Sequence, residues 1–152
     1  MEEMKKEKSC GAVIYKVDEN ERISFLLIKQ KTGHFGFPKG HVENDETEVE
    51  TATREVKEET NLDVIIDTSF RMISTYSPVK GVLKDVIYFL AKPTSEEIIP
   101  QEEEVEVAIW CNYYVAKRLL THRQNKNILR NALNYIKRNV LNKRTCIFQK
   151  RK

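Results

Sequence analysis

The sequence predicts a single α/β (α+β) domain in which a mixed β-sheet is flanked by helices. Its 152 residues are enough for one domain with a real hydrophobic core. Hydrophobic residues make up 40% of the chain and charged residues 32%, as in an ordinary globular protein. Short apolar runs rich in β-branched residues predict strands, and other segments have the periodicity of helices. The sequence contains no internal repeat and no low-complexity linker. We therefore expect one domain over residues 9–140, with an N-terminal tail over 1–8 and a basic C-terminal tail over 141–152.

Several segments have the composition of β-strands. Residues 10–17 and 22–30 are apolar and rich in β-branched and aromatic residues, and the turn DENE between them favours a hairpin. Residues 31–44 contain Gly and Pro at intervals, which is typical of a loop. Further strands are expected over residues 62–66, 70–76, 82–91 and 104–110.

A helix is expected between these groups of strands. Thr47 can cap its N-terminus, and Glu50 three residues later completes a capping box. One apolar stripe follows from the 3.6-residue period; it consists of Val49, Ala52 and Val56. Two further helices are expected over residues 113–120 and 125–140, and the second carries an apolar stripe suited to a core.

Three carboxylates share one face of the first predicted helix, because Glu55, Glu58 and Glu59 stand at positions i, i+3 and i+4. Like charges at these spacings oppose a helix by roughly 0.2–0.5 kcal/mol per pair. A cation held by the cluster most simply explains this arrangement. Ligation by oxygen alone favours Mg²⁺, with Mn²⁺ as a substitute, over Zn²⁺.

Composition also restricts where the chain acts. The longest apolar runs are far too short to span a bilayer, and the N-terminus MEEMKKEKSC lacks the apolar core of a secretory signal. Cys10, Cys111 and Cys146 form no CxxC or Cys/His cluster. We therefore expect a cytoplasmic protein with reduced cysteines and no membrane partner.

Charge is distributed unevenly along the chain. Residues 107–152 contain 12 of the 26 Lys and Arg and none of the 23 Asp and Glu. An acidic body suits metal binding, and a basic end suits phosphate attraction. We interpret the last dozen residues as a solvated basic end, with binding of nucleic acid as the weaker alternative.

The segment over residues 40–62 reads GHVENDETEVETATREVKEETNL. It resembles the Nudix box of hydrolases that act on nucleoside-diphosphate-linked substrates, through Gly40, Glu46 and the run REVKEE. The resemblance implies an α/β/α sandwich and metal-dependent hydrolysis of a phosphoanhydride bond. Asn61 stands where the family usually has Gly, just past the helix end. Because Asn is the next-best residue in the left-handed conformation, we expect a modest loss of stability and intact chemistry.

The resemblance also implies the metal and catalytic residues. The metal ligands would be Glu55, Glu58, Glu59, the backbone carbonyl of Lys39 and Glu104. The catalytic residues would be Glu58, Glu55, Arg54 and Glu104. Arg54 would orient a neighbouring carboxylate, and Gly40 would allow the backbone to approach closely. The general base stays open between the box and a distal loop, where Glu104 is the candidate and Glu103 the alternative in register.

The resemblance extends beyond the box. The lead-in HFGFPKG and the N-terminal SCGAVIYKV are similar to those of asymmetric dinucleoside tetraphosphate hydrolases. That similarity implies a set of substrate-binding residues, namely His34, Lys39, Gly40, Tyr76 and Lys84. The cationic members would bind phosphate oxygens, and Tyr76 would stack on a nucleobase. A half-buried strand aromatic is the alternative for Tyr76.

The leading functional hypothesis is hydrolysis of diadenosine tetraphosphate to ATP and AMP by a monomer that binds a small nucleotide. A second hypothesis is the removal of pyrophosphate from RNA 5′ ends or from nucleoside triphosphates. The basic C-terminal segment mildly supports RNA as the substrate. A nucleotide-binding regulator without turnover is a third, with Asn61 as the only box feature in its favour. The sequence leaves open the polyphosphate length, the preferred base, the number of metals and the oligomeric state.

Overall fold

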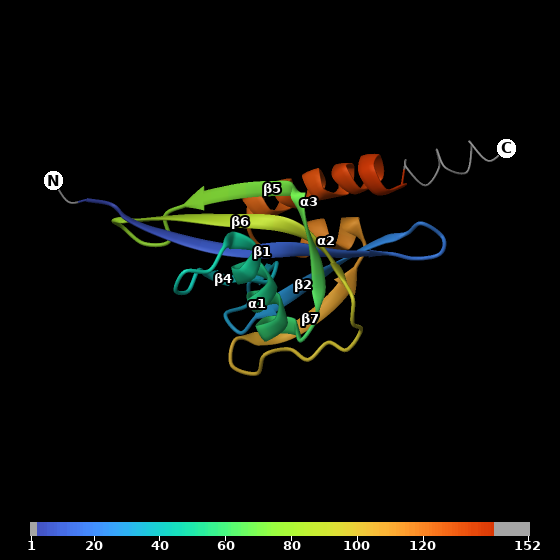
Figure 1. Ribbon diagram of the computed structural model, residues 1–152, viewed down its shortest axis with the longest axis horizontal. Coiled ribbons are helices and arrows are strands. Elements are labelled where there is room, and N and C mark those ends of the chain that lie inside the picture. The colour runs from blue at the N-terminus through green and yellow to red at the C-terminus, as the bar shows by residue number, and fades with distance from the viewer. Residues whose placement is uncertain (1–2, 142–152) are drawn as a thin grey trace.

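The computed structural model describes residues 3–141, which form a seven-stranded sheet with helices on both faces (Figure 1). The elements in chain order are β1 (Lys5–Val17), β2 (Ile23–Gln30), β3 (Phe35–Gly36), β4 (Lys39–His41), α1 (Glu48–Thr60), β5 (Val64–Tyr76), β6 (Val82–Pro93), β7 (Val105–Cys111), α2 (Tyr113–Leu119), α3 (Arg123–Ile136) and a π-helical turn over Lys137–Leu141. The strands pair in the order β3-β2-β1-β6-β5, with β4 beside β1 and β7 beside β2. The predicted mixed sheet flanked by helices is confirmed.

Strand β1 lies at the centre of the sheet and joins its two halves. Its first ten residues run parallel to β6, whereas its last three pair antiparallel with β2. Strand β4 also pairs antiparallel with β1, with Cys10 opposite Gly40 and Gly11 opposite Lys39. The segment that precedes α1 is therefore held against the middle of the sheet.

Side chains alternate along β1 and enter hydrophobic cores on opposite faces of the sheet. Ala12 and Ile14 pack with Val56 of α1. Val13 packs on the other side with Leu129 of α3, in a core to which α2 also contributes. The result is the predicted α/β/α sandwich, with α1 on one face and α2 and α3 on the other.

Helix α1 begins and ends as predicted. The Thr47 hydroxyl accepts a hydrogen bond from the Glu50 N–H at 3.1 Å, and the Glu50 carboxylate accepts one from the Thr47 N–H at 3.3 Å. This is a capping box. Asn61 caps the other end with a φ of 69°, in the left-handed region, and its amide donates to the Glu97 carbonyl at 3.1 Å. Both ends of the helix that carries the carboxylates are thus fixed.

Replacing Asn61 by alanine is expected to lower the free energy of unfolding by about 1–2 kcal/mol, because alanine is strained in the left-handed region and lacks the polar side chain that makes this region tolerable for Asn. Asn61→Gly relieves that strain and loses the same hydrogen bond to Glu97, so its net effect should stay below about 1 kcal/mol. Urea unfolding measures both variants. Equal destabilisation would show that the hydrogen bond, and not the backbone conformation, sets the stability of this helix end.

Most elements differ from the prediction by a few residues at their ends, as in α3 (Arg123–Ile136), which was expected over residues 125–140. Three differences are larger. Strand β1 begins at Lys5, because pairing with β6 extends it through polar residues that show no apolar pattern. The strands expected over residues 62–66 and 70–76 are one strand, β5, with an irregularity in its pairing to β6. The loop expected over residues 31–44 contains β3 and β4, which are too short to show a periodicity in sequence.

Residues 142–152, which include Cys146 and nearly all of the predicted basic tail, lie outside the described residues. Between residues 3 and 141, no helix is long and apolar enough to cross a membrane. Cys10 and Cys111 are free thiols. Burial raises the pKa of Cys10 to about 11, as expected of a thiol that serves packing.

Candidate active site

The three carboxylates predicted to bind metal lie in the second half of α1. Buried Ala52 and Val56 attach the helix to the sheet and so fix the direction of the carboxylate face. The Glu58 side chain is 48% exposed and that of Glu55 12% exposed, whereas Glu59 as a whole is only 4% exposed. The carboxylates therefore extend from solvent into the interior.

Arg54 connects this face to the preceding loop. Its Nη1 donates to Glu55 at 2.8 Å and to both carboxylate oxygens of Glu58 at 3.2 Å. Its Nε and Nη2 donate to the two oxygens of Glu46 at 2.7 and 3.0 Å, and Nη2 also donates to the His41 carbonyl at 2.9 Å. Contacts of this kind are expected of a residue that orients neighbouring carboxylates.

Glu46 holds Arg54 from the other side. Its carboxylate also accepts hydrogen bonds from the Thr51 hydroxyl and the Glu43 N–H, each at 3.0 Å. Arg54, followed by the Glu43 backbone, lowers the pKa of Glu46 to about 2. Because Glu46 stays ionised and both of its oxygens are engaged by protein groups, its structural effect is to position Arg54.

Gly40 makes room for the Glu55 carboxylate beside β4. A β-carbon at position 40 would overlap the carboxyl group of Glu55. Burial raises the pKa of Glu55, and the hydrogen bond from Arg54 opposes that rise. The close packing of backbone against carboxylate therefore requires glycine at this position.

Glu59 is the most buried carboxylate of the set, and it touches β4 directly. Its Oε2 accepts a hydrogen bond from the Lys39 backbone N–H at 3.3 Å. Burial is the main cause, and the negative charge of Glu55 the second, of a pKa for Glu59 that is raised to about 8. A buried carboxylate with so little compensation is a group that a bound cation would stabilise.

The donor set fits a hard divalent cation, because each candidate ligand offers oxygen. The candidates are Glu55, Glu58, Glu59, Glu104 and the Lys39 carbonyl. Within residues 3–141, however, no three His, Cys, Asp or Glu side chains converge on one point. Glu55 and Glu58 instead accept hydrogen bonds from Arg54, which engages Glu55 through Oε1.

The loop before β7 brings Glu104 to the C-terminal end of α1. The Gln101 N–H donates to the Glu59 carbonyl at 3.2 Å, and the Lys31 N–H donates to the Glu104 carbonyl at 3.0 Å. The Glu104 side chain is exposed, and its charge contributes to the raised pKa of Glu59. A carboxylate distant in sequence thus lies within electrostatic reach of the box.

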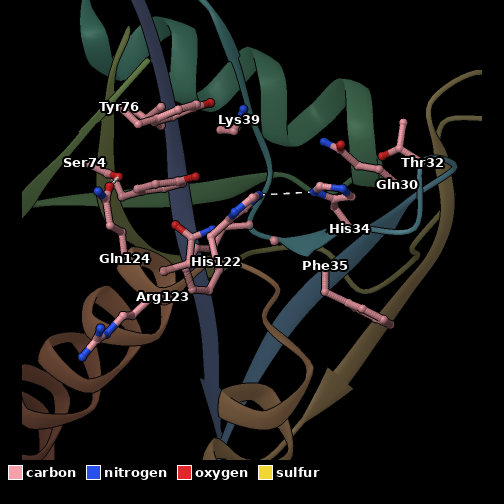
Figure 2. A pocket seen from close by; sticks show the side chains of 15 residues that line it. Gln30, Thr32, His34, Phe35, Lys39, Ser74, Tyr76, His122, Arg123 and Gln124 are labelled. Carbon is pink, nitrogen blue, oxygen red and sulfur yellow. Dashed lines mark hydrogen bonds between the residues drawn. The ribbon is translucent and has the colours of Figure 1, made fainter. Parts of the chain in front are cut away.

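A cavity of about 580 Å³ lies next to the carboxylate helix (Figure 2). Lys39 belongs to both, because its backbone binds Glu59 and its side chain lines the cavity. Of the predicted substrate-binding residues, His34, Lys39 and Tyr76 line the cavity, and Gly40 and Lys84 are not among its lining. The volume lies in the range of small-molecule sites. The other lining residues are Gln30, Thr32, Phe35, Gly36, Phe37, Ser74, Val86, Tyr88, His122, Arg123, Gln124 and Asn125.

The lining of this cavity favours an anion. The described residues that line it include no Asp or Glu, whereas Lys39 and Arg123 are cationic. Lys84 lies close to Lys39 but is only 8% exposed. Burial lowers the pKa of Lys84, and the positive charge of Lys39 lowers it further. Two lysines held together in this way create a positive potential that attracts phosphate.

Sequence reasoning missed the contribution of α3. His122, Arg123 and Gln124 stand at the start of this helix and form one wall of the cavity. The Ser74 hydroxyl donates to Gln124 and so connects this wall to β5. These residues belong to no motif and have no metal-ligand spacing. They reach the cavity only because α3 packs across the sheet, and no local signal could have revealed them.

Comparison with known proteins identifies a family and several relatives that match most of the chain. The family model described as NUDIX domain matches residues 7–132. The chain is 32% identical over 141 residues to the asymmetrical bis(5′-nucleosyl)-tetraphosphatase of Rattus norvegicus, covering 85% of this chain and 95% of the relative. It is 31% identical over 128 residues to the protein of that name from Caenorhabditis elegans, covering 81% and 91%. A crystal structure of a C. elegans Ap4A hydrolase binary complex superposes with a TM-score of 0.78 at 29% identity, covering 86% of this chain and 97% of that one.

Proposed function

Because the chain belongs to the NUDIX domain family of hydrolases, we propose that it hydrolyses a dinucleoside polyphosphate, namely diadenosine tetraphosphate, to ATP and AMP. This proposal rests on Lys39, whose backbone N–H binds Glu59 of the carboxylate helix and whose side chain lines the cavity. No acidic residue is among the described residues that line this cavity. A chain of four linked phosphates extends its negative charge beyond the reach of the metal site, so it needs cationic side chains there as well. The relatives named as asymmetrical tetraphosphatases support this choice of substrate.

In the proposed reaction the oxygen of a water molecule forms a bond to phosphorus, and a P–O bond of the anhydride breaks to release the leaving nucleotide. A Mg²⁺ ion held at this site would neutralise the charge that develops on the phosphates. Glu55, Glu58, Glu59 and the Lys39 carbonyl would hold it. The proton of the attacking water passes to a carboxylate, for which Glu104 and Glu58 are the candidates.

We assign the cavity to the part of the substrate that the metals do not reach. His34 and Lys39 line it and would bind phosphate oxygens, and Lys84 lies beside Lys39. Tyr76 is 38% exposed at the edge of the cavity and would stack on a base. We further propose that the protein acts in the cytoplasm, as a monomer, which cell fractionation and light scattering would test.

One assay tests the function directly. The protein is incubated with Mg²⁺, Mn²⁺ or a chelator, and with dinucleoside polyphosphates, nucleoside triphosphates, ADP-ribose or triphosphorylated RNA. Equal amounts of ATP and AMP from diadenosine tetraphosphate, formed only with a divalent ion, are the expected products. Preferred release of pyrophosphate from RNA or triphosphates would contradict the proposal, and binding without turnover would indicate a regulator. Labelled water identifies the phosphorus that is attacked.

Tyr76→Ala is expected to raise KM for the dinucleotide by about 5- to 150-fold, because a stacked base contributes about 1–3 kcal/mol. The KM for a free triphosphate should change less, and Tyr76→Phe should retain the wild-type value. Tyr114, which is 74% exposed and outside the lining of the cavity, offers a matched control in Tyr114→Ala. Steady-state kinetics with both substrates measures the difference, and equal effects on both would argue against stacking.

A further inference from the structure

Two imidazole rings meet across the cavity. His34 precedes β3, and His122 is the N-cap residue of α3, 88 positions further along the chain. The Nδ1 atom of His34 lies 3.3 Å from the Nε2 atom of His122. The ring centroids are 5.3 Å apart and the ring planes are tilted by 49°. Figure 2 shows this contact as a link between the wall formed by α3 and the opposite side of the cavity.

The His122 ring is available for this contact because it does not cap its own helix. The N-cap position of α3 has no side-chain hydrogen bond to the helix backbone, in contrast to Asn112, which caps α2 through its side chain. Burial, followed by the charges of His34 and Lys39, lowers the pKa of His122. A neutral imidazole can donate from one ring nitrogen and accept at the other.

The direction of this hydrogen bond decides what His34 presents to a ligand. If the Nε2–H of His122 donates to Nδ1 of His34, a neutral His34 carries its own proton on Nε2 and can donate to a phosphate oxygen. If the bond runs the other way, a neutral His34 presents a lone pair at Nε2, which repels that oxygen. An anion in the cavity therefore selects the first direction.

We propose that His122 is a positioning residue for His34, whose Nε2–H it keeps available for the phosphate groups of the substrate by donating a hydrogen bond to His34 Nδ1. This inference rests on the proposed function only in its choice of substrate. It gives His122 a role through His34, without contact to the reacting atoms. The two rings come from separate elements, so the pair also fixes the position of the α3 end across the cavity from β3.

A double-mutant cycle tests the coupling between the two residues. His122→Leu, which keeps the volume and removes the donor, is expected to raise KM for diadenosine tetraphosphate about fivefold and change kcat less than about twofold. His122→Gln, which retains an N–H at the same reach, should recover most of the loss. His34→Ala and the His34→Ala/His122→Leu double variant should have the same KM. If the KM of the double variant instead rose by the product of the two single effects, the proposal would be overturned.

A second readout does not depend on turnover. In ¹⁵N-labelled protein saturated with inorganic tripolyphosphate, NMR of the ring nitrogens should show His34 with a proton fixed on Nε2, and His122→Leu should shift its signals toward a mixture of tautomers. Unchanged His34 signals would overturn the proposal. If the protein does not cleave the dinucleotide, the same four variants are compared by calorimetry, which measures the Kd for inorganic tripolyphosphate in place of KM. The coupling between His34 and His122 is then tested even though the proposed function has failed.

Discussion

Glu58→Gln is expected to lower kcat by about 100-fold or more, with little change in stability. A carboxylate that accepts a proton in the transition state contributes about 10²- to 10⁴-fold, and glutamine keeps its shape without its charge. The fold should tolerate the change because the Glu58 side chain is 48% exposed. Arg54 keeps its contacts to Glu46, Glu55 and the His41 carbonyl. Thermal unfolding and steady-state kinetics of the same preparation separate the two effects.

Glu50→Gln is the matched control for this experiment. Glu50 is an exposed acid on the same helix, and glutamine at its position can complete the capping box with Thr47. Its kcat and its unfolding temperature should stay close to those of the wild type. If Glu58→Gln also kept near-normal kcat, the assignment of Glu58 to the metal set would be wrong, and the base and ligands would have to be sought among Glu55, Glu59 and Glu104.

The carboxylate face and its helix could be predicted because their signals are local. Thr47, Glu50 and the spacing of Glu55, Glu58 and Glu59 all lie within one helix and its cap, where sequence separation determines position. The structure forms the capping box as expected and places Asn61 in the left-handed conformation. The metal roles of these residues remain predictions, because no three acidic, His or Cys side chains converge on one point within residues 3–141.

The cavity could be predicted only in part, because its walls come from distant segments. His34 and Tyr76 were found through resemblance to a family, whereas His122 belongs to no motif and meets His34 across 88 positions. The burial of Lys84 and its proximity to Lys39 depend on the pairing of β1 with β6 and β4. Such pairings are set by tertiary packing, and the polar first residues of β1 carry no periodic signal for them.

Gly40→Ala is expected to reduce activity while leaving the fold almost intact. Gly40 has a negative φ, so the backbone itself accepts alanine. The new β-carbon would overlap the carboxyl group of Glu55, which is the end of a flexible side chain and can move away. Glu55 would then lose its hydrogen bond to Arg54 and its place beside Glu59. Loss of a positioned ligand of this kind typically lowers metal affinity or activity about 10- to 100-fold.

Gly11→Ala distinguishes this effect from simple crowding. Gly11 lies opposite Lys39 in the β1–β4 pair, next to the Cys10–Gly40 pair. A β-carbon there would overlap the Pro38 carbonyl oxygen and approach the Lys39 β-carbon to 2.7 Å. Because backbone cannot swing aside, Gly11→Ala should lower the free energy of unfolding by about 1–3 kcal/mol. Gly40→Ala should instead raise the Mg²⁺ concentration needed for half-maximal activity, at an unfolding temperature near that of the wild type. If Gly40→Ala retained the wild-type Mg²⁺ dependence, the position of Glu55 beside Gly40 would have no part in metal binding.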